Sequence, residues 1–369
     1  MKLPHIKLAD LTRMQRDLAA LMPQSVLGTP SGGASTGRLQ AVDPFGDNPG
    51  NLRMLSYVPP GLPPGAPLVL VLHGCTQNAA GYDAATGWST LAERHGFALV
   101  YPEQVRGNNM NGCFNWFEPA DVTRGHGEAA SIDAMVGAML ATHGCDPARV
   151  MVTGLSAGGA MTAAMLTLYP ERFTAGAIIA GLPFGAAQNT RQALAAMARC
   201  PQHTGREWGD LVRAASPGRS HVPLVSVWHG DADRTVALGA AIESAKQWTE
   251  MHGLSGESGQ EDTVDGVPHR VWRDRAGRVC VETYIVPGFG HGTPICTRAA
   301  GDAGVGHADR YVMESAISST WHIARGWGIV PVDAGTKAAT PPGPRGPLPV
   351  PPLEVLGRGL HDLVRKLSR

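Results

Sequence analysis

The sequence is poor in charged residues, in cysteine and in long apolar runs, and each shortage excludes a class of protein. Only 17% of the 369 residues are charged, and Lys plus Arg balance Asp plus Glu at 31 each. Balanced charge gives no electrostatic footprint for nucleic acid, so we expect no nucleic acid partner. No apolar run is long enough to span a bilayer. What remains is a globular chain that can bury a substantial core.

Six cysteines are too few to define a disulfide scaffold in a chain of this length. None of them shows the paired Cys-x-x-Cys spacing of a zinc site, so we expect no metal. Two interpretations of the cysteines stay open, because some lie near the motifs below and could form bridges, whereas small buried thiols are equally common. The four cysteines that lie near these motifs are Cys75, Cys113, Cys280 and Cys296.

Residues 1–10 carry charges and a proline where a signal peptide needs an unbroken apolar core. This pattern favours the cytoplasm, unless the start codon is misassigned or the chain uses another export route. Residues 1–40 form a first segment, with an amphipathic helix predicted over 8–22 and a Gly/Ser/Thr-rich linker over 28–37.

The last segment, residues 332–369, also differs from the body in composition. It begins with a Pro-rich spacer that includes residues 341–352 and ends in a helix whose apolar stripe is flanked by basic residues. Such terminal helices could pack on the body or pair between subunits. Alternatively, they could hold the protein on a polymer granule or a membrane surface.

The body, residues 41–331, alternates short strands with helical stretches. One strand is apolar at every position, as in a parallel sheet covered by helices on both faces. A β-α-β-α order predicts an α/β fold with an open, mostly parallel sheet, whose ligands bind beyond the carboxyl ends of the strands. The predicted strands are 52–58, 68–72, 98–101, 150–153, 177–180, 223–228 and 281–286.

A Gly-x-Ser-x-Gly motif joins the strand at 150–153 to a helix-forming run. A sharp strand-to-helix turn strains its central residue, and Gly154 and Gly158 leave room for that turn. Ser156 would then stand exposed above the strand as a nucleophile. The free N–H of Ala157, at the start of the helix, would point at an oxyanion forming on the attacked carbonyl.

A serine nucleophile needs a histidine base and a carboxylate that orients it, in the chain order serine, acid, histidine. Asp231 and Asp233 follow the strand at 223–228, and we favour Asp233 as the acid because it lies further into the loop. Asp231 is interpreted as a turn residue that caps backbone N–H groups. His291 follows the strand at 281–286 between two glycines and is the predicted base.

The turn after the strand at 68–72 is placed to supply the second oxyanion donor, for which the N–H of Cys75 is our candidate. His73 also lies there, but the chain order argues against it as the base. A short loop further on carries three aromatic residues, which could be core or could line the site for an apolar acyl or polyester chain. They are Phe114, Trp116 and Phe117.

Together these motifs resemble the esterase/poly(3-hydroxybutyrate) depolymerase family of the α/β-hydrolase superfamily, over roughly residues 50–325. The resemblance implies an α/β-hydrolase fold and a serine esterase with the triad Ser156, Asp233 and His291. It also implies that Cys75 supplies an oxyanion N–H and forms a bridge with Cys113. The segments that carry it are 72–77, 101–104, 113–117, 152–161 and those around His229 and His291.

We therefore expect a carboxylic-ester hydrolase that needs no cofactor and acts on an ester or polyester. Short-chain polyhydroxyalkanoate, such as poly(3-hydroxybutyrate), or its oligomers are the leading substrates, and feruloyl or acetyl xylan esters are the alternative. A hypothesis of another class is that the terminal helices make this chiefly a granule- or membrane-associating protein.

Overall fold

The computed structural model describes residues 37–219 and 221–331. The predicted helix over 8–22, most of the linker that follows it, the Pro-rich spacer and the C-terminal helix all lie outside the described residues. The first compact unit of the chain ends at Val330, next to the boundary expected at residue 331. Within the described ranges, no helix combines the length and apolarity needed to span a membrane.

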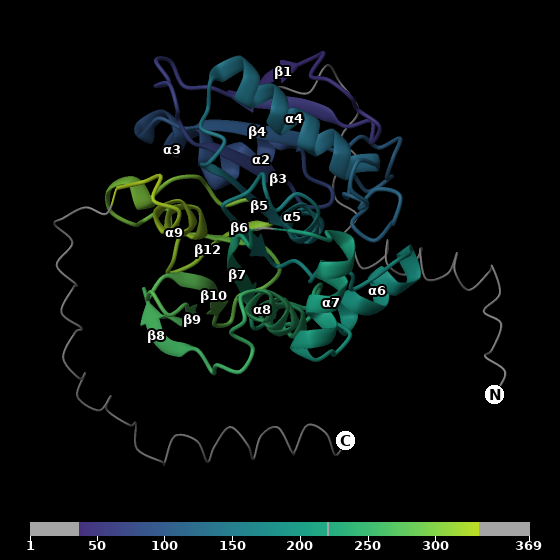
Figure 1. The fold of residues 1–369 in the computed structure, drawn as a ribbon. Coiled ribbons are helices and arrows are strands. Elements are labelled where there is room, and N and C mark those ends of the chain that lie inside the picture. The colour runs from purple at the N-terminus through teal and green to yellow at the C-terminus, as the bar shows by residue number, and fades with distance from the viewer. Residues whose placement is uncertain (1–36, 220, 332–369) are drawn as a thin grey trace, which may run out of the picture. The chain divides into compact units, whose positions relative to one another are not determined.

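Strands run through the middle of this unit, and each of the seven predicted strands is present with bounds that differ by a few residues (Figure 1). The strands are β1 (Gln40–Val42), β2 (Arg53–Tyr57), β3 (Leu68–Leu72), β4 (Ala98–Glu103), β5 (Val150–Leu155), β6 (Ala175–Ile179), β7 (Leu224–Gly230), β8 (Gln260–Val264), β9 (Val267–Arg273), β10 (Val279–Val286), β11 (Thr293–Ile295) and β12 (Val312–Glu314).

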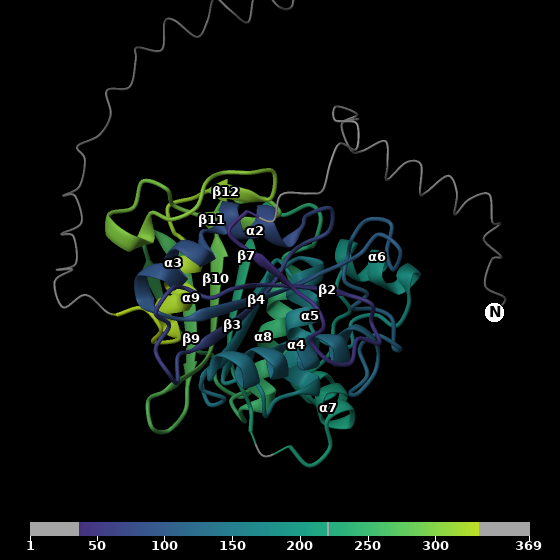
Figure 2. The ribbon, with the colours of Figure 1, turned by 90° about the horizontal axis from the view of Figure 1, so that it is seen from above.

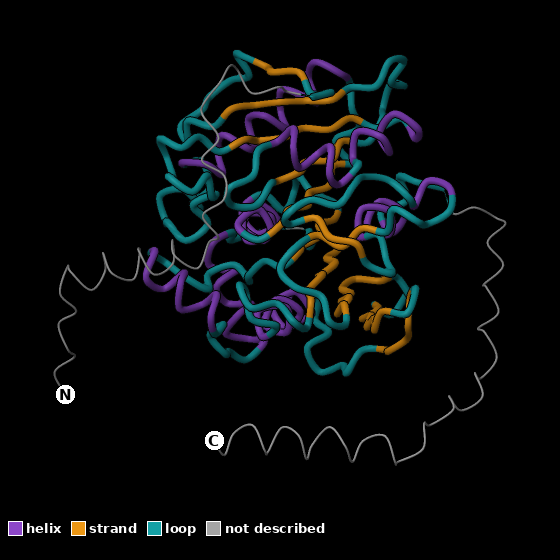
Figure 3. Tube along the Cα trace, turned by 180° about the vertical axis from the view of Figure 1, so that it is seen from behind, coloured by secondary structure: helices purple, strands orange, loops and turns teal. Residues whose placement is uncertain are grey.

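Helices connect most of the parallel strands, and a view from behind shows strands and helices alternating along the chain (Figure 3). The helices are α2 (Ala79–Thr86), α3 (Trp88–His95), α4 (Gly127–His143), α5 (Ala157–Leu168), α6 (Thr190–Ala198), α7 (Gly205–Ala215), α8 (Gly239–Met251) and α9 (Ser319–Gly326), with the short 3₁₀ helix η1 (Gly301–Ala303).

The large sheet has the strand order β1-β2-β4-β3-β5-β6-β7-β10-β9-β8. The six strands from β4 to β10 are parallel to one another, and antiparallel pairs extend the sheet at both edges. The open, mostly parallel sheet expected from the sequence is therefore confirmed. The carboxyl ends of β3, β5, β7 and β10 therefore meet at one edge of the sheet, which is the edge where ligands bind in such folds.

Both faces of the sheet are covered, which explains why β3 is apolar at every position. Leu68, Leu70 and Leu72 pack in one core cluster with residues of α4, α5 and α8. Val69 and Val71 pack in the other, with residues of α2, α3 and α9. Seen from above, α3 and α9 lie on one side of the sheet and α4 and α5 on the other (Figure 2).

No pattern in the sequence marks the hairpin β8–β9, which extends the sheet beyond β10. The reason is that β8 consists of Gln-Glu-Asp-Thr-Val and is exposed along most of its length, so no apolar alternation marks it. β8 pairs with β9 on one side and forms the last strand of the sheet. Its exposed charged side chains suit an edge strand.

A helical segment, α6 and α7, is inserted between β6 and β7 and lies beside α8 (Figure 1). The backbone of Phe184 is held by both ends of the Gln247 amide, at 2.9 Å each, which fixes the start of the segment to α8. The N–H of Ala237 donates to the carbonyl of Met197 at 2.8 Å. The segment is thus attached to the loop after β7, where the predicted acid lies.

Candidate active site

Ser156 lies between the end of β5 and the start of α5, at the sharp turn that the motif predicted. Its φ is 57° and its ψ is −115°, a conformation that costs a non-glycine residue of order 1–3 kcal/mol. The backbone N–H of Ser156 donates to Ile179 O at 2.9 Å, which anchors the turn to β6. The serine is 8% exposed, less than the sequence predicted, since Ala157 beside it packs in one cluster with Trp116.

The two glycines of the motif act through close packing, whereas the strained backbone falls on the serine itself. A Cβ at Gly154 would lie 2.4 Å from the carbonyl oxygen of Gly158. A Cβ at Gly158 would lie 2.3 Å from the carbonyl oxygen of Leu72, at the end of β3. Both glycines are therefore required for α5 to approach β3 and β5, which seats the serine at the edge of the sheet.

Asp233 and His291 are hydrogen-bonded to each other, with 2.7 Å between Asp233 Oδ2 and His291 Nδ1. The other carboxylate oxygen of Asp233 accepts the backbone N–H groups of Thr235 and Val236 at 2.8 and 2.9 Å. Burial would raise the pKa of Asp233, but the hydrogen bond and charge of His291, with the backbone N–H of Val236, outweigh it and lower the pKa. This carboxylate is held ionised and in a fixed orientation.

Asp231 has a different environment, because its carboxylate accepts the backbone N–H of Gly288 at 2.6 Å. Gly288 belongs to the loop after β10 that carries His291. Of the two acids that the sequence left to be distinguished, Asp233 contacts the histidine and Asp231 holds the backbone of the loop.

The loop that carries His291 folds back over the end of β7. Phe289 O accepts the N–H of Ala232 at 3.1 Å, and a Cβ at Gly230 would lie 2.1 Å from that same oxygen. On the other side, a Cβ at Gly292 would lie 2.8 Å from the carbonyl oxygen of Tyr311. Gly292, one of the two glycines that flank His291, therefore leaves room for the backbone of the neighbouring segment.

His229 lies beside Asp233, and the sequence did not reveal a role for it. Its Nε2 lies 2.8 Å from Val236 O and 3.5 Å from Asp233 Oδ2. Burial lowers the pKa of His229, so the ring is neutral and its Nε2–H donates to the carbonyl. This bond closes the loop around Asp233, and the spacing His-Gly-x-x-Asp-x-x-Val was the signal that could have revealed it.

Cys75 lies in a tight turn after β3 and is joined to Cys113 by a disulfide. The side chain of Gln77 accepts the N–H of Gly74 at 2.8 Å, and the N–H of Thr76 donates to Asn111 O at 2.7 Å. Within the described part of the chain, neither the N–H of Cys75 nor that of Ala157 has a protein acceptor. Both donors are available to a ligand, and the turn that carries the first is fixed from two sides.

His73 serves as a structural bridge at this end of the sheet. Its Nδ1 lies 2.8 Å from Gly74 O, and its Nε2 accepts the N–H of Gln104 at 3.1 Å. Burial lowers the pKa of His73, which suits a neutral ring with one donor and one acceptor. Both nitrogens are engaged, so the histidine joins the ends of β3 and β4.

The family model described as esterase PHB depolymerase matches residues 52–265. Poly(3-hydroxyalkanoate) depolymerase C of Paucimonas lemoignei is 46% identical over 293 residues, which are 79% of this chain and 70% of the relative. Feruloyl esterase B of Neurospora crassa is 35% identical over 297 residues, 78% of this chain and 94% of the relative.

The chain belongs to the esterase PHB depolymerase family. It is a carboxylic-ester hydrolase with the α/β-hydrolase fold. Among solved structures, acetyl xylan esterase from Aspergillus awamori is similar to it, with a TM-score of 0.67 and 25% identity, covering 80% of this chain and all of that one. The family resemblance and fold class expected from the sequence are confirmed.

The structure decides between the two possibilities for one residue of the aromatic loop. Phe114 is fully buried, with its ring 5.0 Å from that of His73, centroid to centroid, so it belongs to the core. It is a core residue because the loop turns inward to bring Cys113 against Cys75. Trp116 and Phe117 make an edge-to-face contact at 5.5 Å and pack in the cluster that contains Ala157. They lie beside the strand-to-helix turn at Ser156, which we call the elbow, and their role in substrate binding stays a prediction.

A buried carboxylate that the sequence did not reveal holds this loop in place. Glu128, in α4, is 1% exposed and accepts the N–H of Asn115 at 2.8 Å and the side-chain amide of Gln104. The same amide of Gln104 donates to Cys113 O at 3.0 Å. Burial raises the pKa of Glu128 to about 8. The disulfide, the aromatic loop and the turn after β3 therefore share one polar network.

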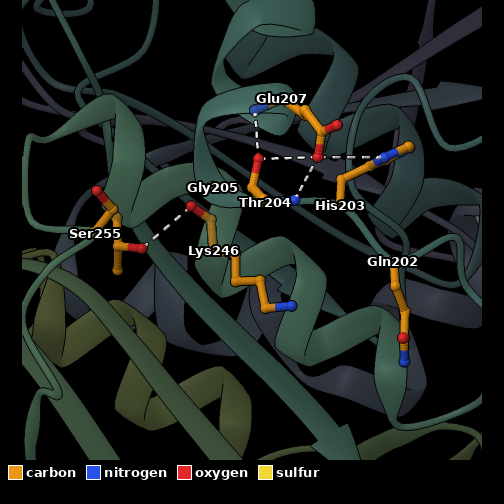
Figure 4. Close-up of a pocket in the computed structure, with 8 residues that line it drawn as sticks. Gln202, His203, Thr204, Gly205, Glu207, Lys246 and Ser255 are labelled. Carbon is orange, nitrogen blue, oxygen red and sulfur yellow. Dashed lines mark hydrogen bonds and ion pairs between the residues drawn. The ribbon is translucent and has the colours of Figure 1, made fainter.

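A surface hollow of about 450 Å³ lies between α7 and α8 and contains none of the predicted catalytic residues (Figure 4). Its polar groups serve the helix, since Thr204 and Glu207 form the capping box of α7. Another, smaller hollow lies beside the turn after β3. Among the described residues, no group of three His, Cys, Asp or Glu side chains is arranged to hold a metal.

Proposed function

We propose that this esterase hydrolyses short-chain polyhydroxyalkanoate or its oligomers, with Ser156 as nucleophile, His291 as base and Asp233 as the orienting acid. The observation that carries the proposal is the 2.7 Å hydrogen bond between Asp233 and His291, formed by loops that follow β7 and β10. Those strands end at the same edge of the sheet as β5, whose strained turn presents Ser156.

The chemistry follows from these positions. Ser156 Oγ attacks the ester carbonyl and loses its proton to His291 Nε2, the ring nitrogen opposite the one bound to Asp233. The backbone N–H groups of Cys75 and Ala157 hold the oxyanion. His291 then gives the proton to the leaving oxygen, an acyl-enzyme forms, and water releases the acyl group by the reverse sequence.

Asp233 contributes because its carboxylate stays ionised throughout. Its pKa is low because the bonds from His291 and the loop backbone outweigh the cost of burial. A fixed negative charge beside Nδ1 selects the tautomer that has Nε2 free to accept a proton, and it stabilises the imidazolium that forms.

The polyester substrate rests on the relative from Paucimonas lemoignei, which is named a poly(3-hydroxyalkanoate) depolymerase and has 46% identity. The esters of ferulate and of acetylated xylan are the alternative, because relatives with those names share 32–35% identity. The same triad would serve all of these esters, so kinetics on defined esters must separate them.

The decisive experiment compares hydrolysis of a 3-hydroxybutyrate trimer, amorphous polyhydroxybutyrate granules and methyl ferulate by the purified protein. We expect release of 3-hydroxybutyrate from the trimer, and the Ser156→Ala variant should lose at least ~10⁴-fold in kcat with its fold intact. Turnover of methyl ferulate alone would keep the triad and replace the substrate. Substantial activity of the Ser156→Ala variant would overturn the triad.

Contact with a granule or membrane surface through the terminal helices remains a prediction from the sequence alone. Sedimentation of the protein with polyhydroxybutyrate granules or liposomes, with and without residues 353–369, tests it. Equal binding of both forms would remove the C-terminal segment from consideration.

A further inference from the structure

A pocket of about 270 Å³ lies between the turn after β3 and the segment that precedes β12. Hydroxyl and amide groups of the turn and of the start of α2 form one wall, and the opposite wall carries one acid, one base and a tyrosine ring. The lining residues are Thr76, Gln77, Asn78, Gly81, Tyr82, Asp309, Arg310 and Tyr311.

The pocket adjoins the proposed catalytic groups on two sides. Thr76 directly follows Cys75, whose N–H is the proposed oxyanion donor. The ring of Tyr311 meets the ring of His291 edge-on, with centroids 6.2 Å apart. The pocket residue Tyr82 is hydrogen-bonded to the segment that follows His291, because its hydroxyl lies 3.0 Å from Thr293 Oγ1. A group bound here would lie next to the histidine that protonates the leaving oxygen.

Arg310 provides the recognition element of this pocket. Its guanidinium lies over the ring of Tyr311, 5.1 Å from the centroid. It has no ion pair with any described residue. The carboxylate of the adjacent Asp309 accepts the backbone N–H of Arg310 at 2.7 Å and forms no ion pair with the guanidinium. Tyr311 therefore contacts both the proposed base and an exposed, unpaired cation.

We propose that this pocket binds the leaving-group end of a hydroxyacid ester and that Arg310 pairs with its free carboxylate. The inference rests on the proposed function and deepens it. In an oligomer of 3-hydroxybutyrate, the unit released as an alcohol from the last ester carries the terminal carboxylate. The Arg310 guanidinium is separated from His291 by the ring of Tyr311, and it matches that carboxylate in charge and in hydrogen-bonding geometry.

The reaction balances as an ordinary ester hydrolysis. Ser156 Oγ bonds to the acyl carbon, the bond from that carbon to the terminal 3-oxygen breaks, and the oxygen takes its proton from His291. The terminal unit leaves as a free hydroxyacid whose carboxylate was bound by Arg310. An esterase built in this way prefers oligomers with a free acid end over the same oligomers capped as methyl esters.

The test measures kcat/KM on the 3-hydroxybutyrate dimer as the free acid and as its methyl ester. For the wild type we expect a preference of about 5- to 10-fold for the free acid, held mostly in KM because the contact exists before the reaction. Arg310→Gln should bring the ratio of the two substrates close to one. Arg310→Lys, which keeps the charge, should retain part of the preference. Arg275→Gln, an exposed arginine in the β9–β10 turn, should keep the wild-type ratio.

Each outcome decides the matter. An Arg310→Gln protein that melts like the wild type and retains the wild-type ratio would overturn the role of Arg310 and leave the proposed function intact. A wild type without preference for the free acid would do the same. A wild type that hydrolyses neither dimer but does hydrolyse methyl ferulate would overturn the substrate class, and this inference with it.

Discussion

The carboxyl edge of the sheet is held in two different ways on its two sides. On the elbow side, formed by the loops after β5, β7 and β10, many of the tight contacts are between main-chain atoms at Gly154, Gly158 and Gly230. On the oxyanion side, formed by the turn after β3 and the loop 104–122, the contacts come from side chains and the disulfide.

This difference predicts different vulnerabilities. Main-chain packing does not depend on a reducing agent, so the elbow side should not respond to reductant and should change when a glycine or a catalytic side chain is replaced. The oxyanion side depends on the protonation of Glu128 and on the bond between Cys75 and Cys113. It should respond to pH and to reductant, and the following experiments sharpen or break the comparison.

The largest effect is expected at the acid. Asp233→Asn removes the charge that orients His291 and should lower kcat roughly 10³–10⁴-fold on the preferred ester. Asp231→Asn is the matched control, because its amide oxygen can still accept the N–H of Gly288, and we expect less than about a threefold change. If the two variants lost activity equally, the assignment of Asp233 would be wrong.

Next in size is the packing of the elbow. Gly158→Ala places a Cβ against the carbonyl oxygens of Leu72 and His73, and neither backbone can move without shifting β3. We expect the free energy of unfolding to fall by more than about 3 kcal/mol in urea denaturation. Gly137→Ala, in α4 with open space around the new methyl, should instead stabilise by about 0.5–1 kcal/mol. Tolerance of alanine at Gly158 would show that the elbow is not fixed by close packing.

The disulfide should matter less for stability but should distinguish the two sides. Replacing Cys75 and Cys113 together by Ser opens a loop of 38 residues and should cost about 2–4 kcal/mol. Because the turn with the oxyanion N–H loses one of its anchors, kcat should also fall. Dithiothreitol should reproduce both effects in the wild type and leave the double variant unchanged. A wild type unaffected by complete reduction would show that the polar network alone holds the turn.

The smallest effect on turnover is expected at Glu128, whose replacement should change the pH dependence of stability. Its pKa rises from 4.5 to about 8 on folding, so between these values the folded protein binds a proton that the unfolded chain releases. Stability should therefore fall as pH rises from about 4.5 to 8, by at most about 1.4 kcal/mol per pH unit, and level off above.

Glu128→Gln should flatten this slope, as measured by urea denaturation at pH 5, 6.5 and 8. Glu257→Gln, at an exposed position, should keep the wild-type slope. An unchanged slope in Glu128→Gln would assign the pH dependence to other groups.

The disulfide between Cys75 and Cys113 also bears on the compartment in which the protein acts. Disulfides persist mainly in oxidising compartments. The Cys75–Cys113 bond therefore weighs against the cytoplasmic expectation drawn from residues 1–10, which lie outside the described part of the chain.

The sequence by itself determined the parallel sheet, the position of the elbow and the order serine, acid, histidine. These are local properties, because apolar runs mark buried strands and glycines mark sharp turns. It also left Asp231 and Asp233 as two neighbouring alternatives and could not separate core from site among the aromatic residues. Nothing in its patterns marked the edge strand β8 or the network around Glu128.

Only the tertiary structure decided those points, since each depends on contacts between residues far apart in the chain. Asp233 reaches His291 across 58 positions, whereas Asp231 is occupied by the backbone of Gly288. Phe114 is core because the disulfide loop turns inward, which composition does not reveal. The pocket with Arg310 exists because the segment before β12 folds against the turn after β3, a neighbourhood that no local pattern encodes.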